Sequence, residues 1–331
     1  MSYALFGALE QGLIYALMAL GVYLSFRVLD FPDLTVDGSF VTGGAVSAVM
    51  ITGGSNPFLA TMLGGIVGFI AGCITGLLHT KGKINPLLSG ILMMTALYSI
   101  NLRITGQPNV SLMNETTIFA TLKGWWEKVG IDEFLFKPFH ALGIEEHTPK
   151  TFLVIISMIL FVYIIKKVMD WLLKTEAGIA LRATGDNARM VKSLSANTNT
   201  YIVVGLGLSN GLVALSGAIF VQYSGFSDLN AGVGMIVVGL ASVIIGEGLF
   251  GKKKIARITL AVILGAIIYR IIIALALQVD FLEASDMKLI SAIIVIIALI
   301  LPIWTKQVKE NKKRSQNKKN FNVPEEKGDE E

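Results

Sequence analysis

The stretch GLIYALMALGVYLSFRVLDFPDLTVDGSF, residues 12–40, decides the fold class of this chain. It starts as an apolar run that can cross the roughly 30 Å hydrocarbon core of a bilayer as a helix. It then breaks at FPDLTVDGSF (31–40), where a proline, two aspartates and a glycine precede a second apolar run. Pro32 lacks a backbone N–H and Gly38 loosens the backbone, so we expect a discontinuity between two helices here.

The composition extends this pattern to the whole chain. Hydrophobic residues make up 53% of it and charged residues 16%, whereas soluble domains carry about 25% charged residues. A large soluble helical core would need polar faces on most helices, and they are missing. We therefore predict an all-α polytopic membrane protein with about nine transmembrane or re-entrant helices. The predicted spans are 4–26, 38–53, 57–78, 86–105, 152–172, 198–222, 231–249, 258–279 and 287–305.

Basic residues predict the orientation of these spans. With nine spans, the Lys- and Arg-bearing segments 79–83, 174–192, 251–257 and 306–319 all fall on one side of the membrane. The positive-inside rule makes that side cytoplasmic. We therefore expect the N-terminus outside and the C-terminus inside. A sequence pI near 9.0 then reflects these cytoplasmic segments, and no nucleic-acid partner is expected.

The spans divide the chain into a transmembrane domain and a tail. Residues 1–305 form the membrane domain, with an external loop at about 106–151 and a cytoplasmic loop at about 174–197. Residues 306–331 are highly charged and are predicted to be disordered. An amphipathic piece of the external loop with Trp125 and Trp126 fits either a surface-lying helix or a small docking structure outside the cell.

Glycines recur every fourth residue in the third predicted span and so line one face of a helix. They are Gly64, Gly68, Gly72 and Gly76. Without side chains on that face, a neighbouring helix can approach closely. Two interpretations stay open: packing within one protomer, and contact between protomers.

Several chemistries are excluded by the residues present. The single cysteine, Cys73, allows no disulfide within the chain, and the three scattered histidines show no metal-ligand spacing. The segment GEGLFGKK (246–253) fits G-x-x-x-x-G-K but has Lys253 where a nucleotide loop needs Ser or Thr. Neither paired carboxylates nor a nucleophile–base set is present. We expect no catalytic residue, no metal site and no cofactor bound by this chain.

Two charges fall within predicted spans. Arg270 interrupts ILGAIIYRIIIALAL, and an unpaired cation in hydrocarbon is costly. In the predicted topology Glu10 and Arg270 both lie in the outer half of the bilayer, so we expect them to pair and join the first span to the eighth. The alternatives are that Arg270 extends outward to the interface, or pairs with Asp280 or Glu283.

The cytoplasmic loop contains ATGDNARMVKSL, residues 183–194. Thr184 or Asp186 could cap a short helix there, with Arg189 and Lys192 toward its end. A short helix parallel to the membrane is a suitable docking element for a cytoplasmic partner. The loop therefore predicts a partner-binding surface.

The run TEAGIALRATGDN (175–187), followed by GLSNGLVALSGAI (207–219), resembles the coupling loop of ABC importer permeases. It is most similar to the branched-chain amino acid and ribose permease superfamily, and the similarity covers about residues 5–303. Within that range, DLTVDGSF, KGKINPLLSGILMMTALYSINLRI and the YR of GAIIYR look most like a subgroup linked with tryptophan, tyrosine or related substrates.

This resemblance implies a plasma-membrane importer for a small polar solute. The expected solute is an amino acid such as tryptophan or tyrosine, or a related compound. Its expected partners are a second permease copy, two cytoplasmic ATPase subunits that bind ATP and Mg²⁺, and an external substrate-binding protein. Residues Arg182 to Leu194 would be the coupling helix, with Ala183, Gly185 and Ala188 allowing close contact. The implied coupling residues are Arg182, Ala183, Thr184, Gly185, Asp186, Asn187, Ala188, Arg189 and Lys192. The alternative is an autonomous secondary transporter or channel without an ATPase.

The opening stretch has a counterpart later in the chain. FPDLTVDGSFVTGGAVSAV (31–49) and FSDLNAGVGMIVVGLASVI (226–244) share Phe, Asp, Leu, Gly and Ser at the same spacing. In the predicted topology they start on opposite sides of the membrane, as the broken helices of an inverted repeat do. The predicted pathway residues are Asp33, Thr35, Asp37, Ser39, Asp228 and Asn230. Alternatively, Asp37 or Ser39 simply caps the second span.

Overall fold

The computed structural model describes a large part of the chain. The described residues are 2–129, 132, 151–251, 254–278, 289–290, 292–294, 296–297 and 300. The charged tail, most of the ninth predicted span, and much of the external loop lie outside them. So do Asp280 and Glu283, the alternative partners of Arg270.

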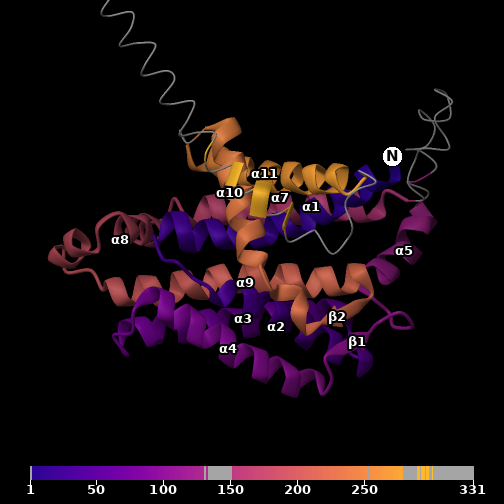
Figure 1. The fold of residues 1–331 in the computed structure, drawn as a ribbon, viewed down its shortest axis with the longest axis horizontal. Coiled ribbons are helices and arrows are strands. Elements are labelled where there is room, and N and C mark those ends of the chain that lie inside the picture. Colours follow the sequence, from indigo (N-terminus) through magenta and orange to yellow (C-terminus); the bar gives the residue numbers. More distant parts are fainter. Residues whose placement is uncertain are drawn as a thin grey trace, which may run out of the picture.

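Helices make up most of the described chain (Figure 1). Two three-residue strands and short 3₁₀ and π segments interrupt them. In chain order the elements are α1 (Ser2–Tyr23), the π-helix η1 (Leu24–Val28), α2 (Thr35–Thr52), α3 (Pro57–Thr80), α4 (Pro86–Thr105), β1 (Asn109–Ser111), α5 (Ile118–Val129), α7 (Leu153–Leu172), α8 (Glu176–Ser193), α9 (Thr198–Ser224), β2 (Phe226–Asp228), the 3₁₀-helix η3 (Leu229–Gly232), α10 (Met235–Phe250) and α11 (Ile255–Ala276).

Six helical segments in the described residues are long and apolar enough to cross a membrane. They are Ala4–Val28, Pro57–Thr80, Pro86–Thr105, Thr198–Ser224, Leu229–Phe250 and Ile255–Ala276. The prediction of an all-α polytopic membrane protein is therefore confirmed. The count of nine, the inverted repeat and the orientation stay predictions.

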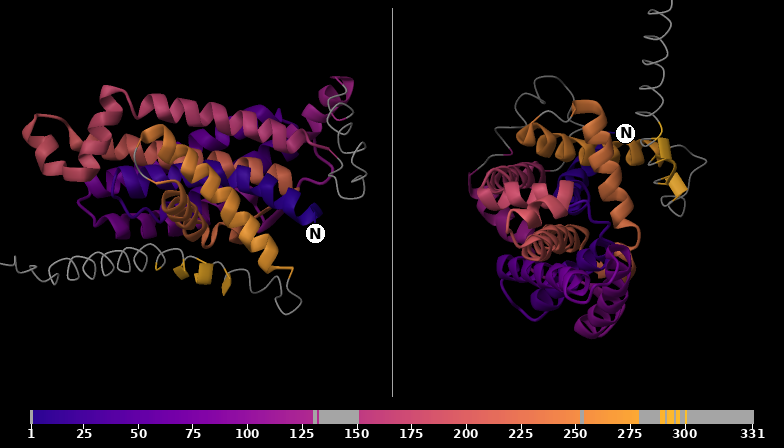
Figure 2. Two further views of the ribbon diagram at one scale, coloured as in Figure 1. Left: turned by 90° about the horizontal axis from the view of Figure 1, so that it is seen from above. Right: turned by 90° about the vertical axis from the view of Figure 1, so that its left-hand side faces the viewer.

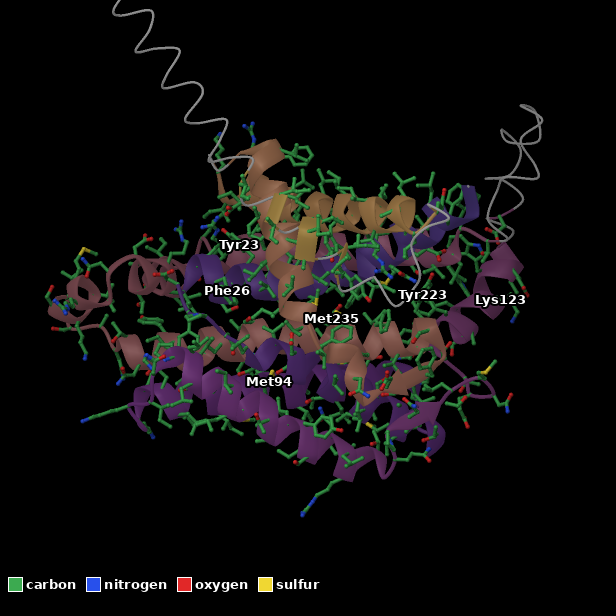
Figure 3. The ribbon with its side chains drawn as sticks, viewed as in Figure 1. Tyr23, Phe26, Met94, Lys123, Tyr223 and Met235 are labelled. Carbon is green, nitrogen blue, oxygen red and sulfur yellow. The ribbon has the colours of Figure 1, made fainter. Side chains whose placement is uncertain are left out.

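The long axis of the described chain separates two unlike ends. Helix α8 lies at one end, whereas α5 and the β1–β2 pair lie at the other (Figures 1 and 2). Strands β1 and β2 are antiparallel, with Val110 opposite Ser227. Along the same axis, Tyr23 lies toward the α8 end and Tyr223 toward the α5 end (Figure 3).

Helix α1 is buried on every side along most of its length. All residues from Gly12 to Ser25 are buried, and α1 packs against α7, α9, α10 and α11. A helix that is apolar all round belongs in the interior of a bundle rather than at its surface. The first apolar run of the sequence therefore forms the central helix of this protomer.

The glycine face of α3 packs inside the protomer. A Cβ on Gly68 would lie 2.2 Å from Ala214 Cβ, and one on Gly72 would lie 2.2 Å from Leu206 O, both on α9. Cβ atoms on Gly64 and Gly76 would likewise meet atoms of α2 and α9 within 3 Å. Of the two interpretations of this face, the structure selects close packing within the protomer.

The predicted break between the first two spans is present at residues 29–34. Asp30 takes a left-handed φ of 51°, and Phe31 N donates to Ser25 O at 2.9 Å, so the chain turns back into the bundle. Helix α2 already begins at Thr35. Gly38 therefore lies inside this helix and does not loosen it. Its missing side chain instead lets α4 approach, because a Cβ there would lie 2.8 Å from Leu97 Cδ1.

Candidate functional site

Asp33 is the centre of a buried hydrogen-bond network at the start of α2. Its Oδ1 accepts from Thr35 N at 2.9 Å, and its Oδ2 accepts from Asn210 Nδ2 at 2.6 Å. Asn210 Oδ1 in turn accepts from Ser39 Oγ at 2.7 Å. Asp33, Ser39 and Asn210 are all fully buried. Because buried polar groups need partners, this network fixes the break against the middle of α9.

A hydroxyl pair extends the same network to α3. Thr35 Oγ1 and Thr75 Oγ1 are 2.8 Å apart, and both side chains are fully buried. Three of the predicted pathway residues, Asp33, Thr35 and Ser39, are thus enclosed and bonded to this chain's own groups. They hold α2, α3 and α9 together.

Asp37 has different partners from Asp33. Its Oδ2 accepts from Gly234 N at 2.9 Å, and its Oδ1 accepts from Ile236 N at 2.7 Å. These N–H groups belong to the start of α10, where no intrahelical acceptor exists for them. Asp37 therefore caps a helix 197 residues away in sequence. The alternative that Asp37 or Ser39 caps its own span is wrong, because α2 begins at Thr35 and Asp33 supplies the acceptor there.

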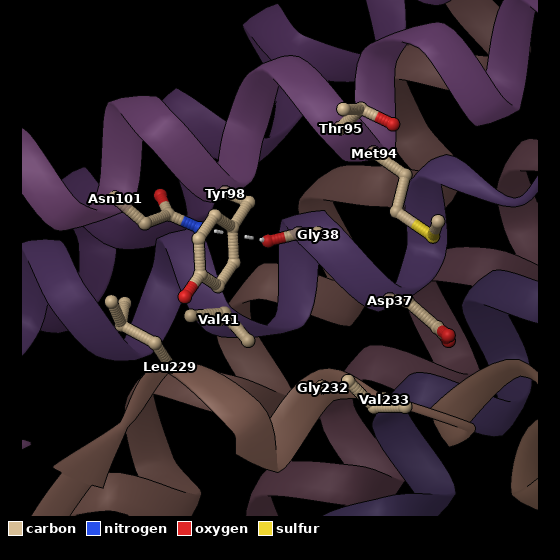
Figure 4. Close-up of a pocket in the computed structure, with 10 residues that line it drawn as sticks. All are labelled: Asp37, Gly38, Val41, Met94, Thr95, Tyr98, Asn101, Leu229, Gly232 and Val233. Atoms are coloured by element: carbon tan, nitrogen blue, oxygen red, sulfur yellow. Dashed lines mark hydrogen bonds between the residues drawn. The ribbon is translucent and has the colours of Figure 1, made fainter. Parts of the chain in front are cut away.

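A cavity of about 320 Å³ opens beside Asp37 between α2, α4 and η3 (Figure 4). Its lining combines apolar side chains with a few polar groups. The lining residues are Asp37, Gly38, Val41, Met94, Thr95, Tyr98, Asn101, Leu229, Gly232 and Val233. Of the predicted pathway residues, Asp37 alone is in this lining.

Asn101 is part of the cavity lining, but its side-chain oxygen is buried. The residue is 1% exposed. Its Nδ2 donates to Gly38 O at 3.4 Å, while its Oδ1 is buried and has no hydrogen-bond partner in the described structure. Figure 4 shows Asn101 and Asp37 at opposite sides of the view, with the Tyr98 ring between them.

Asp228 and Asn230 flank the cavity wall without lining it. Asp228 Oδ1 accepts from Asn230 N at 2.9 Å, the same two-residue turn that Asp33 makes with Thr35. In the alignment of the two stretches, Asp37 coincides with Gly232, and a Cβ on Gly232 would lie 2.2 Å from Asp37 O. The two breaks therefore meet inside the bundle, and the repeat relation between them stays a prediction.

The predicted coupling helix, Arg182 to Leu194, spans a kink within the longer helix α8. Asn187 in α8 has non-helical angles (φ −160°, ψ 88°), and its Oδ1 accepts from Met190 N at 3.1 Å. Asn187 is thus the cap of the short helical piece that follows it. The expectation that Thr184 or Asp186 provides this cap is wrong: Thr184 Oγ1 donates back to Ala180 O at 2.7 Å.

The predicted coupling residues fall into an anchored and an exposed group. A Cβ on Gly185 would lie 2.1 Å from Val28 O, so this glycine packs α8 directly on the end of η1. Residues 182–185 are buried or half-buried. The exposed members are Asp186, Asn187, Ala188, Arg189 and Lys192. The expected close contact through Gly185 is thus made with this chain's own first helix.

The intramembrane cation has another partner than the predicted one. Arg270 Nε donates to Gln11 Oε1 at 2.7 Å, and its Nη2 donates to the same oxygen. Its guanidinium carbon lies 5.2 Å from the centre of the Tyr15 ring. Glu10 instead accepts from Tyr223 Oη at 2.8 Å. The first helix and α11 are joined as expected, through Gln11 in place of Glu10.

An ion pair near α8 was missed by the sequence reasoning. Arg27 Nη2 on η1 lies 2.5 Å from Glu247 Oε2 near the end of α10. The Glu247 side chain is only 6% exposed. An acid close to the end of an apolar run is a signal for such a pair. Asn101 and Asn210 carry the same kind of signal, a polar residue inside an apolar span, and were missed as well.

The described residues contain no group of three or more His, Cys, Asp or Glu side chains that could hold a metal ion. The polar side chains described above act as hydrogen-bond donors and acceptors or as members of ion pairs. Such groups can bind and release a solute or transmit a movement between helices.

Comparison with known proteins gives one consistent result. Residues 4–320 match a family described as branched-chain amino acid transport system, permease component. A tyrosine transport system permease protein of Clostridioides difficile is 41% identical over 87% of this chain and 88% of its own length. An uncharacterized protein of Rickettsia prowazekii is 33% identical over 88% and 95%. A galactofuranose transporter permease protein of Escherichia coli is 28% identical over 70% and 61%. No solved structure matches significantly.

Proposed function

Because the chain belongs to the family of branched-chain amino acid transport permeases, we propose that it forms the membrane pathway of an ATP-driven importer for tyrosine, tryptophan or a related compound. It is a permease of an ABC-type transport system and a multi-pass protein of the cell membrane. The 41% identity to a protein named for tyrosine transport supports an aromatic amino acid as the solute.

The proposed assembly contains two copies of this permease, two cytoplasmic ATPase subunits and an external binding protein that delivers the solute. ATP and Mg²⁺ are bound by the ATPase, and this chain is non-catalytic. In this assembly the α8 end faces the cytoplasm, and the α5 end faces the binding protein. The transmembrane domain is then 1–305, with the external loop at about 106–151, the coupling loop at about 174–197 and a cytoplasmic tail at 306–331.

The exposed part of α8 is the observation that carries this proposal. After the kink at Asn187, the short piece that bears Arg189 and Lys192 is open to solvent. Behind it, Gly185 is seated on the backbone of η1. A partner that binds the exposed piece can therefore push on η1 without an intervening flexible segment.

The contacts then continue from η1 to the cavity. Arg27 on η1 is paired with Glu247 near the end of α10, and the start of α10 is held by Asp37 beside the cavity. Helix α10 is thus attached at both of its ends. In the proposed mechanism, closure of the ATPase pair moves α8 and η1, and α10 passes this movement to the cavity wall.

An autonomous secondary transporter is the second candidate. The meeting of the two breaks at Asp37 and Gly232 favours it, because discontinuous helices that meet in the membrane interior are typical of such transporters. It predicts uptake driven by an ion gradient and no ATPase partner. It gives the exposed end of α8 no role.

The substitution Arg189→Glu tests the coupling surface. It reverses an exposed charge that makes no hydrogen bond or ion pair with the described residues, and a misplaced charge at an interface costs several kcal/mol. We expect ATP-driven uptake into proteoliposomes to fall at least about tenfold and less ATPase to co-purify.

The matched control is Lys123→Glu on α5, which reverses an exposed charge at the other end of the bundle. Because the α5 end faces the binding protein in the proposed assembly, the readout for this control is co-purification, and we expect the amount of ATPase that co-purifies to stay unchanged. If the native permease co-purifies with no ATPase and an ion gradient drives its uptake, the secondary transporter is correct instead.

A further inference from the structure

A second cavity, of about 410 Å³, opens between the start of α1 and the end of α11. We propose that it is a site for the carboxylate group of the amino acid solute, and that Arg270 is the residue that binds this group. The inference rests on the proposed function and deepens it, because it names a chemical group of the solute that the permease itself recognises.

The two helices place this cavity at one end of the bundle. Ala4 and Gln278 line its outer part, whereas Gln11 and Arg270 line it about two helical turns deeper. The N-terminus and the end of α11 lie at the end of the bundle that also carries α5 (Figure 2). In the proposed assembly this end faces the binding protein, so the cavity lies on the side from which the solute is delivered.

Arg270 is held in place with part of its guanidinium group free. Its Nε and Nη2 both donate to Gln11 Oε1, and its guanidinium carbon lies over the Tyr15 ring. An arginine has five N–H donors, so the other three have no partner among the described residues. No Arg270 nitrogen is both buried and without a partner, so the free Nη1 is accessible in the cavity that this residue lines.

The cavity contains a cation and no acid to compensate it. None of the described residues that line it is an aspartate or a glutamate. The neighbouring Glu10 accepts from Tyr223 Oη and does not line it. A cation without a counter-charge in a membrane-spanning segment is costly, and a bound carboxylate removes this cost. The two carboxylate oxygens also match the parallel N–H groups of a guanidinium, so geometry and charge favour the same group.

The rest of the lining leaves room for the body of the solute. A Cβ on Gly7 would have no atom within 4 Å, so the α1 wall is open at this position. Ala274 and Leu277 add apolar surface on the α11 side, against which an aromatic side chain can lie. The exposed Gln278 is at the outer part, where water can enter and hydrate the amino group. The volume also lies within the range of small-molecule sites.

Three probes test which group of the solute is recognised. Tyrosine has both charged groups, 3-(4-hydroxyphenyl)propanoate lacks the amino group, and tyramine lacks the carboxylate. Binding is measured on the permease–ATPase complex in phosphatidylcholine nanodiscs without the external binding protein, and empty nanodiscs correct for partition into lipid. We expect tyrosine and the propanoate to bind. Tyramine should bind at least about tenfold more weakly, because it cannot accept the charged hydrogen bonds of Arg270.

Two variants test the site itself. Arg270→Gln removes the cation but keeps an amide that can bond to Gln11, so we expect tyrosine to bind at least about tenfold more weakly and its preference over tyramine to disappear. Gly7→Leu fills the cavity and should abolish tyrosine binding. It should also fold, because its Cβ meets no atom within 4 Å and leucine favours a helix more than glycine does.

The matched control is Gly124→Leu on α5. A Cβ on Gly124 would likewise have no atom within 4 Å, and this glycine does not line the cavity. We expect it to bind tyrosine as the native complex does. Melting temperatures of all three variants show that each is folded.

The possible failures can be told apart. If the complete system shows no ATP-driven uptake of tyrosine or tryptophan, the proposed function is wrong. If uptake is present but the native complex binds no tyrosine, or binds tyramine as tightly, or if Arg270→Gln or Gly7→Leu keeps native binding, the carboxylate site is wrong. If nanodiscs of phosphatidylglycerol abolish tyrosine binding, the anionic group that Arg270 binds is a lipid headgroup, and the proposal is overturned as well.

Discussion

Asp33 and Asp37 belong to one short stretch of sequence and have opposite surroundings. Asp33 is fully buried and bonded to Thr35 and Asn210, which are fully buried as well. Asp37 is bonded to the free backbone N–H groups of another helix and lines a cavity of about 320 Å³. The first acid joins helices whose relative position is fixed. The second holds the start of α10 beside a cavity, into which this helix end can move.

The helices that Asp33 joins and the helices that Asp37 joins also differ in how they contact each other. Helices α2 and α9, which the Asp33 network joins, touch backbone to backbone farther along α2: a Cβ on Gly43 would lie 1.9 Å from Ala214 O, and one on Gly217 would lie 1.9 Å from Phe40 O. Helices this close cannot slide without a clash. Near Asp37, α10 is held at its start by two hydrogen bonds. We therefore regard α2, α3 and α9 as the rigid part of the protomer. Helices α10 and α11 also touch backbone to backbone, since a Cβ on Gly246 would lie 2.1 Å from Ala261 O, so we regard α10, together with α11, as the movable part.

The substitution Asn210→Leu breaks the rigid side of this comparison and has the largest expected effect. It leaves Asp33 Oδ2 without its donor and Ser39 Oγ without its acceptor, each fully buried. An unsatisfied buried polar group costs about 1–3 kcal/mol, so we expect the variant to lose about 3 kcal/mol of stability and most of its folded yield. Thermal melting and gel filtration in detergent measure both.

Ser209→Ala is the neighbouring control. Ser209 Oγ donates to Gly21 O at 2.7 Å, and its loss leaves no buried group without a partner except a backbone carbonyl. We expect a cost of about 1 kcal/mol. If Asn210→Leu melts at the same temperature as Ser209→Ala, the Asp33 network is not the fixed centre of the protomer.

The substitution Asp37→Ala breaks the movable side and has an intermediate effect on stability. Replacing a helix cap with alanine costs about 0.5–2 kcal/mol, so the variant should fold and bind its ATPase. Because the start of α10 is then no longer held, we expect ATP-driven uptake to be lost. Uptake and melting temperature are measured on the same preparation.

Asp228→Ala is the control for Asp37→Ala, since Asp228 accepts from Asn230 N in a local turn and does not line the cavity. It should keep uptake. If Asp37→Ala keeps full uptake, α10 is not the movable part. If it destabilises the protein as much as Asn210→Leu, Asp37 is as important for the folded structure as the Asp33 network. The distinction between a rigid and a movable part is then wrong.

The helices were predictable from the sequence because apolar runs and terminal signals agree. The third and fourth spans were predicted to begin at residues 57 and 86, and α3 and α4 begin there. In both helices a proline follows an asparagine whose side chain accepts from the N–H two residues on. Proline at the first position and asparagine as the cap are local preferences, so the sequence contains them in full.

The partners of the site residues could not be predicted in this way. The contact from Asp37 to α10 spans 197 residues, and no local pattern encodes it. Arg270 binds Gln11 and not Glu10, although Glu10 and Gln11 are adjacent in the sequence. Consecutive residues point about 100° apart around a helix, so hydropathy identifies the helix but not which of the two faces α11.

The coupling loop shows the same limit for caps. Asp186 and Asn187 have similar preference as caps, so composition could not choose between them. Which of the two residues is the cap depends on the close packing of Gly185 against η1, because this contact fixes where the first part of α8 ends. Arg189 and Lys192 are exposed among the described residues, and their contact with an ATPase stays a prediction.

The pair Thr35 and Thr75 sharpens the comparison and has the smallest expected effect. Thr75 Oγ1 also lies 3.2 Å from Ala71 O, so it keeps a partner when Thr35→Val removes the contact between the two hydroxyls. We expect each single valine variant to cost about 0.5–1 kcal/mol and the double variant to cost less than the sum of both. A double-mutant cycle of melting temperatures measures this difference. Additive costs would mean that the two hydroxyls are not coupled, and the rigid part would then depend on Asn210 and the glycine contacts alone.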